Sequence, residues 1–331
     1  MSDVDPSLAY QQLQPDEVLD AVESHGFLCD GRLLALNSFE NRVYQVGLED
    51  REPVIAKFYR PNRWSDEAIQ EEHDFALELT EAEVNVVPPL RNAAGETLCR
   101  HGPFRFALFP RAGGRAPMLD DQSNLEQLGR FLGRMHAVGA VGRFRHRPDL
   151  TIEAYGTRSR EFLIREGFIP AELREAYDSL SADVLRRVQW CYERAGESAL
   201  IRTHADFHVG NILWTAQGPC VVDLDDARTA PAVQDIWMLI SGDRADRTRS
   251  LHSILDGYTQ FRDFDPRELH LVEALRTLRL MHYYAWIARR WTDPAFPHFF
   301  SWFNTQRCWE DHILTLREQA ANMEEEPLRW P

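Results

Sequence analysis

Residues 203–213 read T-H-A-D-F-H-V-G-N-I-L, and residues 221–226 read V-V-D-L-D-D. The first segment contains the pattern H-x-D-x-x-x-x-N, and the second is an apolar run, typical of a strand, that ends in Asp. In this order Asp206 can hold a substrate hydroxyl, while Asn211 and Asp223 can hold Mg²⁺ against nucleotide phosphates. These three groups form the C-terminal half of a phosphoryl-transfer site.

We predict different roles for these three residues and for the two neighbouring histidines. We expect Asp206 to accept or orient the proton of the attacking hydroxyl, Asn211 to bind one metal ion, and Asp223 to bridge the metal ions and the β and γ phosphates. Magnesium prefers such hard oxygen ligands and keeps several waters. We interpret His204 and His208 as residues that brace the loop through backbone hydrogen bonds and packing.

Three more carboxylates follow this segment. Asp225 and Asp226 fit either a supporting position beside the metal or a surface turn, and the sequence leaves both alternatives open. Asp235 could cap a helix or anchor the catalytic loop from below, and we interpret it as structural.

The other half of such a site needs a cation on a strand, held by a Glu from the next helix. Lys57 lies in residues 54–59, V-I-A-K-F-Y, which resemble the V-A-I-K type of strand. Alternation along a strand puts Ile55, Lys57 and Tyr59 on one face. A lysine in such a strand is usually an ordinary edge residue, but the downstream Asp, Asn and Asp make the nucleotide-binding interpretation the better one.

The helix after this strand offers two carboxylates to the lysine, Glu71 and Glu72. Ser65 predicts the N-cap of this helix. We favour Glu72 because it shares the inner, apolar stripe of the helix with Phe75 and Leu79.

A phosphate-covering G-x-G-x-x-G motif does not occur before this strand. Residues 37–42, N-S-F-E-N-R, stand in its place, and their backbone N–H groups and the Ser38 hydroxyl could contact the nucleotide. The alternative for Ser38 is an ordinary hairpin turn. The missing motif argues against a protein kinase of the eukaryotic type.

The periodicity of the whole chain places a small sheet before a mostly helical region. Strands are predicted at residues 33–36, 42–46, 53–59, 96–99 and 104–109. Helices are predicted to open at Pro15 and Ser65, and later to cover residues 125–138, 152–196, 233 onward, 247–262, 266–291 and 306–323. The pattern breaks at residues 110–115. We therefore expect an α+β, protein-kinase-like fold with two lobes, a nucleotide-binding antiparallel-sheet lobe at 1–110 and a helical catalytic and substrate lobe at 111–331.

The composition excludes several classes of protein. The chain has 331 residues, 44% hydrophobic and 27% charged, which suits a globular protein with sizeable cores. A net charge of -15 leaves no broad basic face for nucleic acid or an anionic membrane. Residues 1–6 are acidic and lack the apolar core of a signal peptide. Five scattered cysteines indicate reduced thiols, so we expect a cytoplasmic protein. We also expect the tail at residues 324–327 to be loose.

The quoted segments also resemble a known group. Residues 204–214, H-A-D-F-H-V-G-N-I-L-W, the run V-V-D-L-D-D, and P-A-V-Q-D at 231–235 are similar to the aminoglycoside phosphotransferase and choline kinase superfamily, over about residues 33–290. Three further segments resemble the bacterial stress response kinase A family, which is a narrower group. With these segments included, the resemblance extends over almost the whole chain. These segments are L-N-S-F-E-N-R-V-Y at 36–44, K-F-Y-R-P at 57–61, and Y-A-W-I-A-R-R-W-T-D-P-A-F-P at 284–297.

The resemblance implies a monomeric, ATP- and Mg²⁺-dependent serine/threonine protein kinase of the cytoplasm, linked to survival under stress. By position it assigns the proton acceptor to Asp206, the metal ligands to Asn211 and Asp223, and the nucleotide-loop site to Ser38. One departure is visible, because the usual Gly before the catalytic Asp is Ala205. Its methyl group could shift the loop if this position needs a positive φ.

Two other functions compete with the protein kinase. A small-molecule kinase for an amino alcohol, sugar or antibiotic is favoured by the short stretch from Asp223 to residue 233, which leaves no room for a long activation segment. The aromatic residues at 283–309 could line a cation pocket, although a packed core is the commoner use. The acidic excess could steer basic substrates of either kind. A catalytically dead nucleotide-binding regulator is the third alternative, and the sequence speaks against it, since Lys57, Asp206, Asn211 and Asp223 are all intact.

Overall fold

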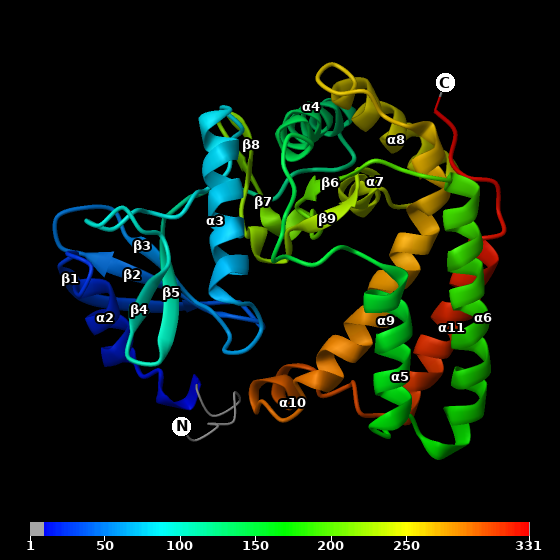
Figure 1. The fold of residues 1–331 in the computed structure, drawn as a ribbon, viewed down its shortest axis with the longest axis horizontal. Coiled ribbons are helices and arrows are strands. Elements are labelled where there is room, and N and C mark those ends of the chain that lie inside the picture. The colour runs from blue at the N-terminus through cyan, green and yellow to red at the C-terminus, as the bar shows by residue number, and fades with distance from the viewer. Residues whose placement is uncertain (1–9, 331) are drawn as a thin grey trace. The chain divides into compact units, whose positions relative to one another are not determined.

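The computed structural model describes residues 10–330, so the expectation for residues 1–6 lies outside its range (Figure 1). Contacts along the chain group it into two units. The sheet unit comprises residues up to 118 together with 144–147 and 208–227, and the helical unit comprises the rest. The division into domains at residue 110 stays a prediction.

The sheet unit is built on a five-stranded antiparallel sheet with the order β1-β2-β3-β5-β4 (Figure 1). Its strands are β1 (Cys29–Leu36), β2 (Arg42–Leu48), β3 (Val54–Phe58), β4 (Cys99–His101) and β5 (Phe104–Pro110). A hairpin of β7 (Ile212–Thr215) and β8 (Gly218–Val221) belongs to the same unit. It joins the unit through a parallel bridge from Val221 to Val86.

The expected strand at 96–99 is shifted toward the C-terminus, since β4 begins at Cys99. The Asn92 side chain accepts hydrogen bonds from the N–H groups of Ala94 and Glu96, both at 2.9 Å. Asn is a typical turn residue for this reason, and the turn takes these residues out of the strand.

The core of the sheet unit forms where one apolar face of the sheet meets a short helix, α2 (Pro15–Glu23). The buried residues Val18 and Val22 of α2 belong to the same cluster as Phe58 and Phe106, whose rings stack with centroids 5.2 Å apart. Aromatic pairs of this kind add to the stability that burial provides.

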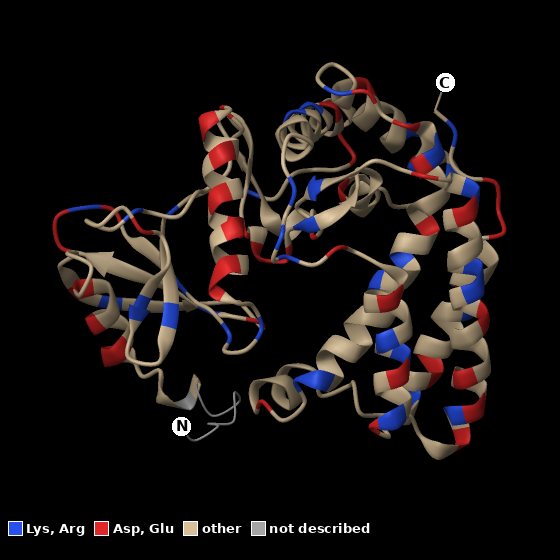
Figure 2. Cartoon of the chain, viewed as in Figure 1, with Lys and Arg blue, Asp and Glu red and all other residues tan. Residues whose placement is uncertain are grey.

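The helix α3 (Asp66–Glu81) begins at the predicted cap, because the Ser65 hydroxyl accepts a hydrogen bond from the Ala68 N–H at 3.2 Å. Acidic residues recur along α3, which has no Lys or Arg (Figure 2). Most of them are solvated, but Glu72 is buried.

In its described residues, the helical unit contains eight α-helices and one two-stranded sheet. Its helices are α4 (Gln122–Gly139), α5 (Arg158–Arg165), α6 (Ala171–Ala195), α7 (Val233–Ile236), α8 (Arg244–Tyr258), α9 (Val272–Arg289), α10 (Ala295–Phe299) and α11 (Gln306–Asn322). Its two strands are β6 (Leu200–Thr203) and β9 (Arg228–Pro231), which pair antiparallel. In Figure 1, α6 and α11 run side by side, and these two helices are in contact.

Helical segments in this unit are shorter than their periodicity predicts. The expected helix 152–196 contains a π-helical turn (Glu153–Thr157) before α5 and is interrupted between α5 and α6, where Gly167 has a φ of 71°. Such a φ suits Gly and ends a helix. The expected helix 266–291 opens with 3₁₀ turns, and α10 was not predicted.

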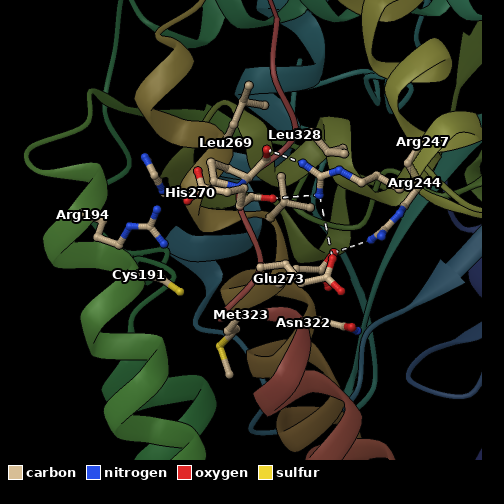
Figure 3. Close-up of a pocket in the computed structure, with 14 residues that line it drawn as sticks. Cys191, Arg194, Arg244, Arg247, Leu269, His270, Glu273, Asn322, Met323 and Leu328 are labelled. Atoms are coloured by element: carbon tan, nitrogen blue, oxygen red, sulfur yellow. Dashed lines mark hydrogen bonds and ion pairs between the residues drawn. The ribbon is translucent and has the colours of Figure 1, made fainter.

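The C-terminal segment is packed against the helical unit, so the expectation of a loose tail at 324–327 is wrong. The Arg244 guanidinium donates hydrogen bonds to the carbonyls of Glu326 at 2.8 Å and Pro327 at 2.9 Å, in the pocket that Figure 3 shows. Leu328 is buried beside them. The acceptors are backbone carbonyls, so the side chains of the three consecutive glutamates could not predict these contacts.

In the described part of the chain, no helix combines the length and apolar character that crossing a membrane requires.

Helices α4 and α8 pack through glycines, and this close approach generates a test. A Cβ atom on Gly129 would lie 1.9 Å from the Ile254 carbonyl oxygen, so backbone would have to move. We predict that Gly129→Ala lowers the free energy of unfolding by about 1–3 kcal/mol, the usual cost of overpacking. Urea denaturation measures this change. Gly113→Ala is the matched control, because its Cβ would meet nothing within 4 Å, and equal losses in both variants would contradict the packing argument.

Candidate active site

The centre of the sheet unit holds a buried lysine among three carboxylates. Lys57 lies on β3, and its Nζ atom is 3.1 Å from Glu72 Oε1, 3.0 Å from Asp223 Oδ1 and 3.2 Å from Asp225 Oδ1. Burial lowers the pKa of the Lys57 ammonium, but the charges of Asp223, Asp225 and Glu72 outweigh it and raise that pKa well above its usual range. The lysine therefore stays charged at neutral pH.

The amino-acid sequence adds weight to this residue, because Lys57 is the only lysine among the 37 Lys and Arg residues of the chain. All the other residues in this count are arginines. The two residues are not interchangeable, since the ammonium is a compact point charge and the guanidinium is a wide, planar fork. A lysine at this one position indicates that the site needs the smaller group.

The structure places Glu72, and not Glu71, against the lysine. Glu71 accepts hydrogen bonds from the N–H groups of Arg145 at 2.7 Å and of His146 and Arg147 at 3.0 Å. It therefore fixes the segment 144–147, while the buried Glu72 faces the lysine from the inner stripe of α3.

Asp225 belongs to the charged cluster, which decides the alternative that the sequence left open. It is 4% exposed and forms ion pairs with Lys57 and with the Arg63 guanidinium. Burial raises the pKa of Asp225, but the positive charges of Arg63 and Lys57 lower it by a larger amount. The net shift of this pKa is therefore downward. Asp226 is more exposed and pairs with Arg63 at 2.8 Å.

Arg147 is a second buried cation that sequence reasoning missed. Its guanidinium donates hydrogen bonds to the carbonyls of Ala68 at 2.9 Å and Ala227 at 2.5 Å, and it lies over the Trp64 ring at 4.7 Å. It also lies 3.6 Å from Glu72 Oε2. Arg147 thus ties α3 to the turn that carries Asp225, and no local pattern in the sequence marks it.

A pocket of about 360 Å³ opens beside the cluster, and all of its lining residues belong to the sheet unit. Its apolar wall includes Leu36, Val43, Ile55, Val87, Phe109 and Leu213. Its polar end includes Ser38, Lys57, Glu72, Asn211 and Asp223. An apolar wall with a few convergent polar groups is typical of a small-molecule site.

The polar end of the pocket suits a magnesium ion. The Asp223 side chain is 51% exposed, and Asn211 lines the same pocket. Magnesium is usually bound through one or two carboxylates, with waters and substrate phosphates completing its shell. Asp223 has a φ of 62°, a left-handed conformation that costs a non-glycine residue energy and often occurs at functional sites.

The loop at 37–41 is braced from its own unit by Arg60, which sequence reasoning missed. The Arg60 guanidinium donates to the carbonyls of Glu40 at 2.9 Å and Phe39 at 3.2 Å, and the Arg60 N–H donates to Asn41 Oδ1 at 3.1 Å. Ser38 therefore lines the pocket from a loop held at several points.

Asp206 lies in the helical unit on a loop that Asp235 holds. The Asp235 carboxylate accepts hydrogen bonds from the N–H groups of His204 at 2.8 Å and Ala205 at 2.7 Å, and it is 3.0 Å from His136 Nε2. Asp235 thus anchors the loop from below, which is one of the two roles that the sequence predicted for it. Ala205 has a φ of 63°, so the position that usually holds Gly does need a positive φ.

The two histidines contact backbone in their own units. His204 Nδ1 accepts a hydrogen bond from the Asp206 N–H at 3.3 Å, and His208 Nδ1 accepts one from the Gly210 N–H at 2.9 Å. Both residues brace the chain next to the predicted site residues.

Comparison with known proteins decides the family. A model described as "Phosphotransferase enzyme family" matches residues 32–272. The chain belongs to this family. The expected phosphotransferase enzyme and the expected α+β, two-lobed protein-kinase-like fold are both confirmed.

Full-length relatives narrow the group. The chain is 42% identical to "Stress response kinase A" of Escherichia coli (strain K12), over 98% of this chain and 97% of that protein. It is also 42% identical to "Serine/threonine protein kinase RdoA" of Salmonella typhimurium (strain LT2), over 98% of both. The predicted resemblance to the stress response kinase A family is confirmed.

Solved structures share the fold at lower identity. An amicoumacin kinase, hAmiN, in complex with AMP-PNP, Ca²⁺ and Ami, matches with a TM-score of 0.72 and 19% identity over 95% of both chains. A microcompartment-associated aminopropanol kinase matches with a TM-score of 0.67 and 19% identity over 97% of both chains.

The positive φ of Ala205 generates a stability test. We predict that Ala205→Gly raises the free energy of unfolding by about 1 kcal/mol, because a left-handed conformation costs a residue with a Cβ atom about that much. Thermal or urea denaturation measures the gain. The matched control is Ala182→Gly within α6, where loss of helix propensity should instead cost about 1 kcal/mol. A loss of stability in both variants would contradict the assigned strain.

A buried acid at the start of α7 generates a pH test. Glu268 accepts a hydrogen bond from the Val233 N–H at 2.9 Å, at the start of α7, and burial raises its pKa to about 7. A raised pKa means that the folded protein binds this proton more tightly than the unfolded chain. The stability from Glu268 is therefore present below its usual pKa and is lost as the pH rises through about 7.

The variant Glu268→Gln keeps the acceptor and removes the charge. Relative to wild type, we expect it to gain on the order of 3 kcal/mol of stability at about pH 8 and little at about pH 4.5. Urea denaturation at both pH values measures the difference, with exposed Glu318→Gln as control. An equal difference in the free energy of unfolding at both pH values would contradict the prediction, because Glu268 would then not change its protonation between them.

Proposed function

We propose that this phosphotransferase is an ATP- and Mg²⁺-dependent serine/threonine protein kinase of the bacterial stress response. The observation that carries the proposal is the arrangement at the pocket, where the only lysine of the chain meets Glu72 and Asp223. A lysine held by a helix Glu and an Asp at the end of a strand are the parts that position nucleotide phosphates and metal in kinases. We also propose that it acts as a cytoplasmic monomer, as the family resemblance implies.

Each residue has a role in this proposal. Lys57 holds the nucleotide phosphates and Glu72 holds Lys57. Ser38 and the backbone around it cover the phosphates, and Asn211 and Asp223 hold the metal. Bound magnesium would neutralise charge on the phosphates. Asp206 orients the acceptor hydroxyl and takes its proton.

The names of the full-length relatives support a protein as the acceptor, since one of them is called a serine/threonine protein kinase. One observation favours the alternative, a small-molecule kinase. Only nine residues separate Asp223 from α7, which begins at Val233. Kinases of small molecules also share the fold, among them the amicoumacin and aminopropanol kinases.

The role of Asp206 predicts a split between chemistry and binding. We expect Asp206→Asn to lower the turnover number about 100- to 10,000-fold, the usual contribution of a positioned base. Binding of Mg·ATP should stay close to wild type, because the nucleotide pocket is lined by other residues. Transfer assays with labelled ATP and calorimetric titration measure the two effects. Unchanged turnover would contradict the assignment.

The acceptor is tested in the same assay with three substrates supplied separately, a generic basic protein, choline and an aminoglycoside. Label on protein, lost in Asp206→Asn, is the expected result. Label on a small molecule alone would replace the protein kinase by the alternative. Transfer to nothing, with Mg·ATP still bound, would support a nucleotide-binding regulator.

A further inference from the structure

The carboxylate of Asp206 is paired with an arginine of its own unit. Arg279, on α9, places Nη2 2.6 Å from Asp206 Oδ1. The side chains of Arg279 and Asp206 are 41% and 20% exposed, so this ion pair is open to solvent on the arginine side. Among residues 10–330, the structure gives the Arg279 guanidinium no other ionic partner.

The position of Arg279 is fixed although its tip is exposed. Its neighbours Leu278 and Met281 are fully buried, so α9 is a core helix that cannot easily turn. The helix carries three arginines against one acidic residue, Glu273, and can be followed in Figure 2. Arg276 is engaged elsewhere, at 3.2 Å from Glu273 and 5.0 Å from the Trp237 ring.

A guanidinium has five N–H donors, and the pair with Asp206 uses only part of them. The exposed remainder lies next to the group that must receive the acceptor hydroxyl. A cationic group beside that hydroxyl would meet the guanidinium at short range and be repelled, whereas a carboxylate or phosphate would be attracted. An anion would also give the Arg279 guanidinium a second partner, which weakens its attraction for the Asp206 carboxylate.

We propose that Arg279 is a specificity-determining residue, which selects acceptors that carry an anionic group next to the reacting hydroxyl. The proposal rests on the function proposed above, in which Asp206 receives that hydroxyl. For a protein substrate, the acceptor is then a Ser or Thr with an acidic or phosphorylated neighbour. The net charge of -15 would draw basic molecules toward the surface, so the selection at Arg279 is local.

The test compares two peptides that differ only in the residues flanking one Ser, two Asp in the first and two Lys in the second. We expect wild type to prefer the acidic peptide by about 10- to 100-fold in kcat/KM, the range of one charge-assisted hydrogen bond. Arg279→Ala should reduce this ratio to near one, Arg279→Glu should invert it, and Arg279→Lys should retain part of it.

Arg289→Ala is the control, because Arg289 is an exposed arginine at the C-terminal end of α9, ten residues beyond Arg279, and should leave the ratio unchanged. A purely structural role for Arg279 would slow both peptides equally and keep the ratio, which would overturn the proposal. A wild-type ratio at or below one would overturn it as well.

Failure of the protein kinase itself gives a different pattern. If neither peptide is phosphorylated, the same variants are compared on glycerate, a hydroxyl compound with a carboxylate, and on choline, a cationic one. Asp206-dependent transfer that favours glycerate and depends on Arg279 would retain the selection and replace the protein substrate. Transfer to choline, or to neither compound, would overturn the selection.

Discussion

The charge of one buried lysine holds the candidate site together. Three carboxylates, the buried Glu72 and Asp225 and the half-exposed Asp223, approach Lys57 within 3.2 Å, and without it they would repel one another. Removing one partner of a buried ion pair typically costs about 3–5 kcal/mol, because the charge left behind has no compensation. The Lys57 ammonium thus joins the sheet to the helix that carries Glu72 and to the turn that carries Asp225, and Arg147 adds a second link between that helix and that turn. The half-exposed Asp223 is the member that a metal can most easily engage.

Backbone strain marks the two segments that carry the predicted chemistry. Ala205 and Asp223 both have a φ near 60°, in the left-handed region, and each is held by its surroundings. For Ala205 the restraint is Asp235, which receives two backbone N–H groups. Strained residues persist where the surrounding structure determines them and where function needs a fixed direction. The Ala205 methyl is therefore accommodated in this conformation, at a cost that a glycine would avoid.

The sequence predicts the parts of the site that depend on spacing along one segment. The order of Lys57, Asp206 and Asp223 follows from motifs, and the choice of Glu72 follows from a helical stripe. Arg147 and Arg279 could not be found in this way, since each acts on residues more than 70 positions away. The docked tail escaped prediction for a related reason, because its contacts use backbone carbonyls. Local pattern gives the elements, and only folding shows which distant charges meet.

The most direct test of this account uses the single lysine. An ATP analogue with an acyl group on its terminal phosphate transfers that group to an amine beside the bound phosphates. We expect peptide mass spectrometry to find the acyl group on Lys57, and excess Mg·ATP to prevent the labelling. Labelling of Lys57 that excess Mg·ATP leaves unchanged would contradict the assignment of this pocket to the nucleotide.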